Sequence, residues 1–202
     1  MSRRIRRHVD PLQVRVAVEP SDWLEPYRAH GEGDIWLDLG CGKGELLAHL
    51  AKTYPSIFFI GLEVRRGIAE RYFPQYHRIP NLKLLYGNAN FSIPSMMGPK
   101  KVQRVLIHFP DPCDHKPRYR KRQMVNESLL HGLQEILAPA GIVSFKTDRR
   151  EMFEEVDRLF LSCFEPVGVE PSVAGGGESL SEWEEERLEK SIPVYSMAYR
   201  RP

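Results

Sequence analysis

The sequence is poor in cysteine, in long apolar runs and in net charge. Its three cysteines, Cys41, Cys113 and Cys163, are odd in number, and no two of them form a CxxC pair. This argues against a disulfide scaffold or a zinc site, so we expect no metal and a reducing, cytoplasmic location. The longest nearly apolar stretch, residues 56–64, is about half of a membrane span, so we expect no membrane partner. The arginine-rich N-terminus lacks the apolar segment of a secretory signal.

Charge is balanced overall but concentrated locally. The chain has 29 Lys and Arg against 27 Asp and Glu, which gives a net charge of +2. Residues 3–7 hold four arginines, residues 115–122 hold five Lys or Arg and no acid, and residues 178–190 hold six glutamates. Two basic segments in a nearly neutral protein predict a positive face for a polyanion, with a solvated charge run as the plain alternative.

Short apolar runs alternate with amphipathic stretches along the chain. We expect strands at 35–39, 57–63, 82–87, 102–109, 141–147 and 194–200, and helices at 43–53, 65–77, 121–137, 149–163 and 181–190. Pro74 should break or kink the second helix, and 139–141 should form a turn. The alternation predicts an α/β fold, a mostly parallel sheet with helices on both faces. We expect a basic arm at 1–30 and one domain at 31–202.

In such a sheet, ligands bind beyond the carboxyl ends of the strands. This rule gathers residues 38–45, 63–66, 87–91, 109–118 and 147–149 at one edge of the sheet. The first of these segments, DLGCGKG at 38–44, ends a strand and opens a helix, as a nucleotide-binding loop does. The second begins at Glu63, whose carboxylate can accept hydrogen bonds from ribose hydroxyls. A plain tight turn is the alternative for the glycine-rich segment.

The DLGCGKG segment resembles the S-adenosylmethionine loop of class I methyltransferases. The resemblance implies that Asp38 and the glycines Gly40, Gly42 and Gly44 lie against the methionine part of this cofactor, and that Glu63 holds the ribose. In that family an acid after the third strand contacts adenine; here Asn88 stands in its place and is otherwise a turn former. The G-x-G-x-G spacing differs from the G-x-G-x-x-G of dinucleotide enzymes, which disfavours an NAD oxidoreductase.

The segment after the fourth strand is the most specific part of the sequence. Two prolines flank Asp111 in His-Phe-Pro-Asp-Pro-Cys at 108–113, and the basic run with Tyr119 follows. Cations neutralise phosphates and an aromatic ring stacks on bases, so this segment predicts an acid beside a nucleic-acid surface. It resembles the Phe-Pro-Asp-Pro-Trp plus Lys/Arg/His element of the tRNA (guanine-N7-)-methyltransferase family.

Three further segments are similar to that family, so the resemblance covers nearly the whole chain. They are Phe-Lys-Thr-Asp at 145–148, Ser-Glu-Trp-Glu at 181–184 and Arg-His-Val-Asp-Pro-Leu at 7–12. Cys113 replaces the usual tryptophan, and Ser181 replaces a threonine but keeps the hydroxyl. The basic run is one residue longer than in the family, so the substrate lysine matches His115 or Lys116, and we prefer Lys116.

The resemblance implies a Rossmann-like domain with a C-terminal antiparallel strand, which transfers a methyl group from S-adenosylmethionine to N7 of a guanine in the variable loop of tRNA. Asp111 would be the catalytic residue and also contact the cofactor. The residues implied to bind the tRNA are Lys116, Arg118, Arg120, Asp148, Ser181, Glu182, Trp183 and Glu184. Guanine N7 has a free lone pair, so positioning matters more than a strong base, and no covalent role is needed for Cys113.

Several alternatives remain open from the sequence. Asp111 and Asp148 can each stabilise the positive charge that develops on the base or hold the guanine edge, and Asp148 can instead cap a helix. A methyltransferase for a small molecule or a protein would leave the basic run at 115–122 unexplained. A non-catalytic RNA-binding module that keeps the fold is suggested by Cys113 and Asn88.

Overall fold

A computed structural model describes residues 11–112, 122–168 and 182–202 of the chain. In these residues seven strands form one sheet in the order β3-β2-β1-β4-β5-β7-β6. The strands are β1 (Asp34–Leu39), β2 (Ile57–Glu63), β3 (Leu82–Tyr86), β4 (Val102–His108), β5 (Leu137–Thr147), β6 (Glu165–Gly168) and β7 (Tyr195–Arg200). Strands β1 to β5 run parallel to one another, and β7 is antiparallel to β5 and β6. The expected α/β sheet and its antiparallel last strand are confirmed.

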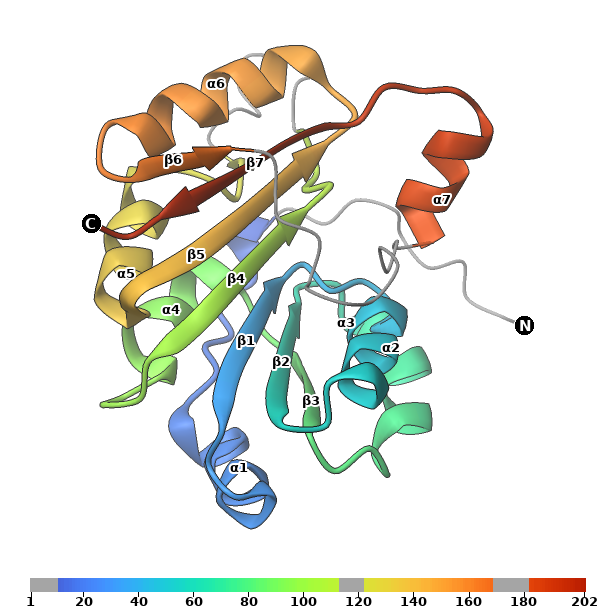
Figure 1. Cartoon of the computed structure of the whole chain (residues 1–202). Coiled ribbons are helices and arrows are strands. Elements are labelled where there is room, and N and C mark those ends of the chain that lie inside the picture. Colours follow the sequence, from blue (N-terminus) through green and yellow to red (C-terminus); the bar gives the residue numbers. More distant parts are fainter. Residues whose placement is uncertain (1–10, 113–121, 169–181) are drawn as a thin grey trace.

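Helices cover both faces of the sheet (Figure 1). They are α1 (Leu24–His30), α2 (Glu45–Thr53), α3 (Arg66–Tyr72), α4 (Ala89–Met96), α5 (Glu127–Ile136), α6 (Arg150–Leu161) and α7 (Glu182–Glu189). Apolar side chains of α1, α4, α5 and α6 pack on one face, and those of α2 pack on the other. Period-two alternation produces this division, because Ile35, Leu37 and Leu39 enter the first cluster and Trp36 enters the second.

The arrowheads of β1, β4 and β5 in Figure 1 point to the same edge of the sheet, and α7 lies beside that edge. The parallel register explains this, because strands joined by right-handed crossovers end on the same side. The loops after β1 to β5 therefore meet there, and they contain the residues that the sequence assigns to the site.

The break expected at Pro74 is present, since α3 ends at Tyr72 and a 3-10 turn follows over Phe73–Tyr76. Other details differ from the sequence expectations. Helix α5 starts at Glu127 rather than at 121, because the Asn126 side chain accepts a hydrogen bond from Leu129 N and caps it there. Helix α4 and strand β6 were not predicted, since α4 contains Pro94 and β6 is only four residues long.

The segment before β1 joins the core. Trp23 is fully buried, and its Nε1 donates to the carbonyl oxygen of Met96 at 2.9 Å. Val18 and Tyr27 are also buried in the same apolar cluster. The boundary at residue 30 stays a prediction, but the described part of the expected arm packs on the domain from Val18 onward.

No described helix is both long and apolar enough to span a bilayer. The His, Cys, Asp and Glu side chains within 11–112, 122–168 and 182–202 form no group of three that could hold a metal ion. The expectation of no metal remains a prediction.

Candidate active site

The glycine loop folds back over the end of β2. The backbone N–H groups of Gly40 and Cys41 both donate to the carbonyl oxygen of Leu62, at 2.8 and 2.9 Å. The three loop glycines have positive φ angles, and Gly44, with φ +85°, starts α2. A Cβ atom on Gly44 would clash with Leu84 Cδ1, so the leucine side chain would have to shift, in addition to the strain from the positive φ.

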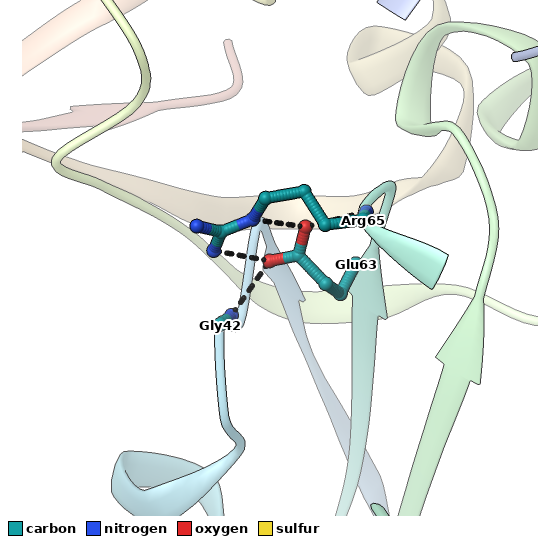
Figure 2. A network of polar contacts seen from close by, with 3 residues as sticks. All are labelled: Gly42, Glu63 and Arg65. Carbon is teal, nitrogen blue, oxygen red and sulfur yellow. Dashed lines mark hydrogen bonds and ion pairs between the residues drawn. The ribbon is translucent and has the colours of Figure 1, made fainter. Parts of the chain in front are cut away.

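Glu63 ends β2 beside this loop and is only 2% exposed. Its Oε2 accepts hydrogen bonds from the backbone of Gly42 at 3.1 Å and from Arg65 Nη2 at 2.9 Å. Its Oε1 accepts from the backbone N of Arg65 at 2.7 Å and from Arg65 Nε at 2.9 Å. Figure 2 shows the guanidinium of Arg65 lying along the carboxylate, with the Gly42 amide on the other side. Arg65 belongs to the 63–66 segment that the sequence places at this edge, but no motif singles out this arginine.

Asp38 ends β1 next to Glu63 and is 4% exposed. Burial, together with the negative charge of Glu63, raises the pKa of Asp38 to about 7. Burial also raises the pKa of the neighbouring Cys41 thiol, so this thiol stays protonated and is a poor nucleophile. We call the edge where the loops after β1 to β5 meet the mouth of the site. It holds a carboxyl group, Asp38, that a cationic ligand would ionise by lowering its pKa.

Asp111 lies at the same edge, beyond the end of β4. The Phe109 amide donates to Lys146 O at 2.7 Å, and Phe109 has a φ of +50°, so the chain turns sharply at the ends of β4 and β5. Asp111 is exposed, and its charge raises the pKa of Arg65 together with the larger effect of Glu63. Arg65 therefore lies in the electrostatic field of both acids, with Glu63 as the much closer partner.

The flanks of the undescribed segment 113–121 also lie at this mouth. Gln123 Nε2 donates to Pro112 O at 3.3 Å, so the two described flanks of this segment lie close together. The Met124 side chain approaches the loop, since a Cβ on Gly40 would lie 3.3 Å from its Cε. Asn90 Nδ2 donates to Met124 O at 3.2 Å, which joins this segment to α4.

Two ion pairs hold α7 against the end of β5. Lys146 Nζ lies 2.9 Å from Glu184 Oε1, and Arg187 Nε lies 3.2 Å from Asp148 Oδ2. Asp148 and Glu184, both assigned to tRNA binding from the sequence, are thus placed together in this structure. The alternative that Asp148 caps a helix does not match α6, whose N-cap residue is Arg149.

Asn88, assigned to adenine from the sequence, is 4% exposed and fully engaged with the backbone. Its Nδ2 donates to Pro11 O at 2.7 Å and to Val14 O at 2.9 Å. Its Oδ1 accepts from Asn90 N at 3.1 Å and so caps α4. The side chain fastens the N-terminal segment to the end of β3, and its contact with adenine stays a prediction.

His108 is a buried histidine of the site that the sequence did not single out. Its Nε2 lies 2.9 Å from Ser144 Oγ, and its buried Nδ1 has no hydrogen-bond partner. Burial, with the positive charges of Lys146 and Arg104, lowers the pKa of His108 to about 3, so the ring is neutral near pH 7.

The remaining assigned residues cannot be placed. Cys113, Lys116, Arg118, Arg120 and Ser181 lie outside the described residues. Glu182 and Trp183 lie in the first turn of α7, with side chains that the structure does not describe.

Comparisons with known proteins place the chain among methyltransferases. A family model described as "Putative methyltransferase" matches residues 32–186. A tRNA (guanine-N(7)-)-methyltransferase of Synechococcus sp. (strain JA-3-3Ab) is 34% identical over 165 residues, which is 80% of this chain and 69% of that protein. Another, from Synechococcus sp. (strain CC9902), is 31% identical and covers 98% of this chain and 88% of its own length.

Solved structures show the fold. The 16S rRNA methyltransferase KamB superposes with a TM-score of 0.59 at 15% identity, covering 92% of this chain and 98% of its own. A geranyl diphosphate methyltransferase gives a TM-score of 0.52 at 13% identity, covering 85% of this chain and 72% of its own. Because one acts on RNA and the other on a small molecule by name, the fold alone does not select the substrate.

Proposed function

Because the chain belongs to the tRNA (guanine-N7-)-methyltransferase family, we propose that it transfers the methyl group of S-adenosylmethionine to N7 of a guanine in the variable loop of tRNA. The observation that carries this proposal is the arrangement around Arg65. The backbone N–H of Gly42 in the glycine loop and the Arg65 guanidinium both donate to Glu63, and the charge of Asp111 acts on Arg65. A cofactor loop and the acid of the Phe-Pro-Asp-Pro segment thus share one mouth.

The residues present fit S-adenosylmethionine. Gly40, Gly42 and Gly44 have positive φ angles and no Cβ atom, so a ligand can approach the backbone at these three positions. Asp38 would face the ammonium group of the methionine part, and Glu63 would accept hydrogen bonds from the ribose. When bound, the cofactor supplies a sulfonium methyl group as the electrophile.

Asp111 would act on the guanine. N7 carries a lone pair in the neutral base, so the protein has to position the ring rather than remove a proton. Positive charge develops on the base during transfer, and a carboxylate fixed nearby stabilises it. Asp111 has this place in the fold because Pro110 and Pro112 flank it beyond β4. Asp148 is the second candidate, and its ion pair with Arg187 gives it an additional part in holding α7.

Phosphates of the tRNA would contact the basic run through Lys116, Arg118 and Arg120. The described flanks of this run support the assignment, because Pro112 and Gln123 both lie at the mouth. Ser181, Glu182, Trp183 and Glu184 would contribute from the start of α7. A substrate of this kind implies a cytoplasmic location.

The direct test is nucleoside analysis of tRNA after incubation with the full chain and S-adenosylmethionine carrying a labelled methyl group. We expect 7-methylguanosine, and we expect Asp111→Asn to lower turnover about 100-fold with folding retained. The matched control is Asp34→Asn, which removes an exposed acid at the amino end of β1, on the opposite edge of the same sheet. It should leave turnover unchanged.

The same assay separates the alternatives. Label in protein or in a small molecule but not in tRNA would indicate a different methyltransferase. Binding of tRNA without binding of S-adenosylmethionine would indicate a non-catalytic module. Near-normal turnover of Asp111→Asn would remove Asp111 from the mechanism.

A further inference from the structure

The carboxylate of Glu63 has no acceptor position left for a ligand. A carboxylate offers about four lone-pair sites, two on each oxygen. All four are used, by the backbone N–H groups of Gly42 and Arg65 and by two nitrogens of the Arg65 guanidinium, at 2.7 to 3.1 Å. A ribose diol can bind Glu63 only after at least one of these donors has left.

The guanidinium of Arg65 is the donor that can leave. The other two donors are backbone N–H groups, one in the glycine loop and one at the end of β2. The Arg65 side chain is 33% exposed, and a Cβ on Gly42 would lie 3.9 Å from its Nη2, so the guanidinium lies against the glycine loop at the open side of the mouth. Its long side chain can rotate away without moving the backbone.

We propose that the Arg65 guanidinium occupies the place of the donor's ribose hydroxyls and is displaced when the donor binds, so that Arg65 limits the affinity for the donor. This inference rests on the binding of S-adenosylmethionine in the proposed function.

The test is calorimetric titration of the full chain with S-adenosylhomocysteine, the product form of the donor. Arg65→Met keeps most of the apolar stem and removes both side-chain hydrogen bonds to Glu63. We expect its dissociation constant to be at least fivefold lower than that of the unsubstituted chain. Arg65→Lys replaces the forked guanidinium beside Glu63 with a single ammonium group. We expect its dissociation constant to lie between those of the unsubstituted chain and of Arg65→Met.

Arg66→Met is the matched control. Arg66 is the next residue, its side chain is 73% exposed, and it pairs with Glu70 within α3 at 2.7 Å. Its substitution should change the dissociation constant less than twofold. A second probe, the 2′,3′-dideoxy analogue of S-adenosylhomocysteine, should not gain from Arg65→Met, because the competition is for the hydroxyl groups.

The outcomes separate the two proposals. If the unsubstituted chain binds neither S-adenosylmethionine nor S-adenosylhomocysteine, the proposed function fails and this inference with it. If it binds them and Arg65→Met binds equally or more weakly, only this inference is overturned, and Arg65 instead orients Glu63 for the ribose. An equal gain for the dideoxy analogue also overturns it, since displacement by the diol would not be the cause.

Discussion

Asn88 stands where the class I methyltransferase resemblance leads us to expect an acid, and its surroundings give a clear expectation for a substitution. Its amide donates two hydrogen bonds, to Pro11 O and Val14 O, and the side chain is buried. Asn88→Asp restores the acid of the family but removes both donors, since an ionised carboxylate only accepts. It also places negative charge against two carbonyl oxygens. We expect the N-terminal segment to loosen.

The size of the effect follows from these two bonds. Each contributes about 1 kcal/mol net, and a buried acceptor left unpaired costs about 1–3 kcal/mol. The bonds from Asn88 N to Val16 O and from Val18 N to Ser92 Oγ do not use the amide and should persist. Two carbonyl oxygens lose their donor, at a cost of at least about 1 kcal/mol each, so we expect the free energy of opening of this segment to fall by about 2 kcal/mol.

Hydrogen exchange measures this opening directly. The amides of residues 14–18 should exchange about 30-fold faster in Asn88→Asp. The matched control is Asn90→Asp, the same change two residues later, where the amide donates to Met124 O instead. It should loosen the chain near Met124 and leave residues 14–18 protected. Unchanged exchange at 14–18 in Asn88→Asp would refute the anchoring role of the amide.

Two further predictions concern stability. Because burial and Glu63 raise the pKa of Asp38 to about 7, above its unfolded value near 4, the folded chain binds the extra proton between these values. The free energy of unfolding, measured by urea titration, should thus fall as pH rises from about 4 to 7, by at most about 1.4 kcal/mol per pH unit. An equal fall in the Asp38→Asn variant would contradict this prediction. Gly44→Ala should lower the free energy of unfolding by about 3 kcal/mol, because of its positive φ and the contact with Leu84. The control Gly31→Ala should lower it by about 1 kcal/mol, because φ is also positive, at +107°, but nothing lies within 4 Å of the added Cβ. Equal losses in thermal unfolding would exclude a role for Leu84.

The sequence predicted the parallel part of the sheet well, because buried strands between amphipathic helices have a strong local signal. It did less well where local signals conflict. The turn predicted at 139–141 is wrong, because these residues lie inside β5 at an irregularity, where Leu137 pairs with Val102 and Ile142 with Arg104. Helix α4 holds Pro94 and is only eight residues long, so its signals, the cap at Asn88 and the buried Ile93 and Met96, are weak in the sequence.

The site shows a similar limit. Its location could be predicted, because parallel strands bring their loops to one edge. Its side-chain partners could not, because they are distant in sequence. The pairs of Lys146 with Glu184 and of Arg187 with Asp148 join β5 to a helix formed much later in the chain. Arg65 was missed for the opposite reason, since a single arginine beside an acid is too common to mark a site.

The position of β7 inside the sheet affects how the chain can assemble during synthesis. Strand β6 is made before β7 but joins the sheet only through it, and β5 likewise has β7 as its neighbour on that side. Until Tyr195–Arg200 leave the ribosome, the backbone of β5 presents an unpaired edge, and β6 has nothing to pair with. Loss of these last residues would thus remove two strands rather than one and leave an open edge on which other chains could aggregate.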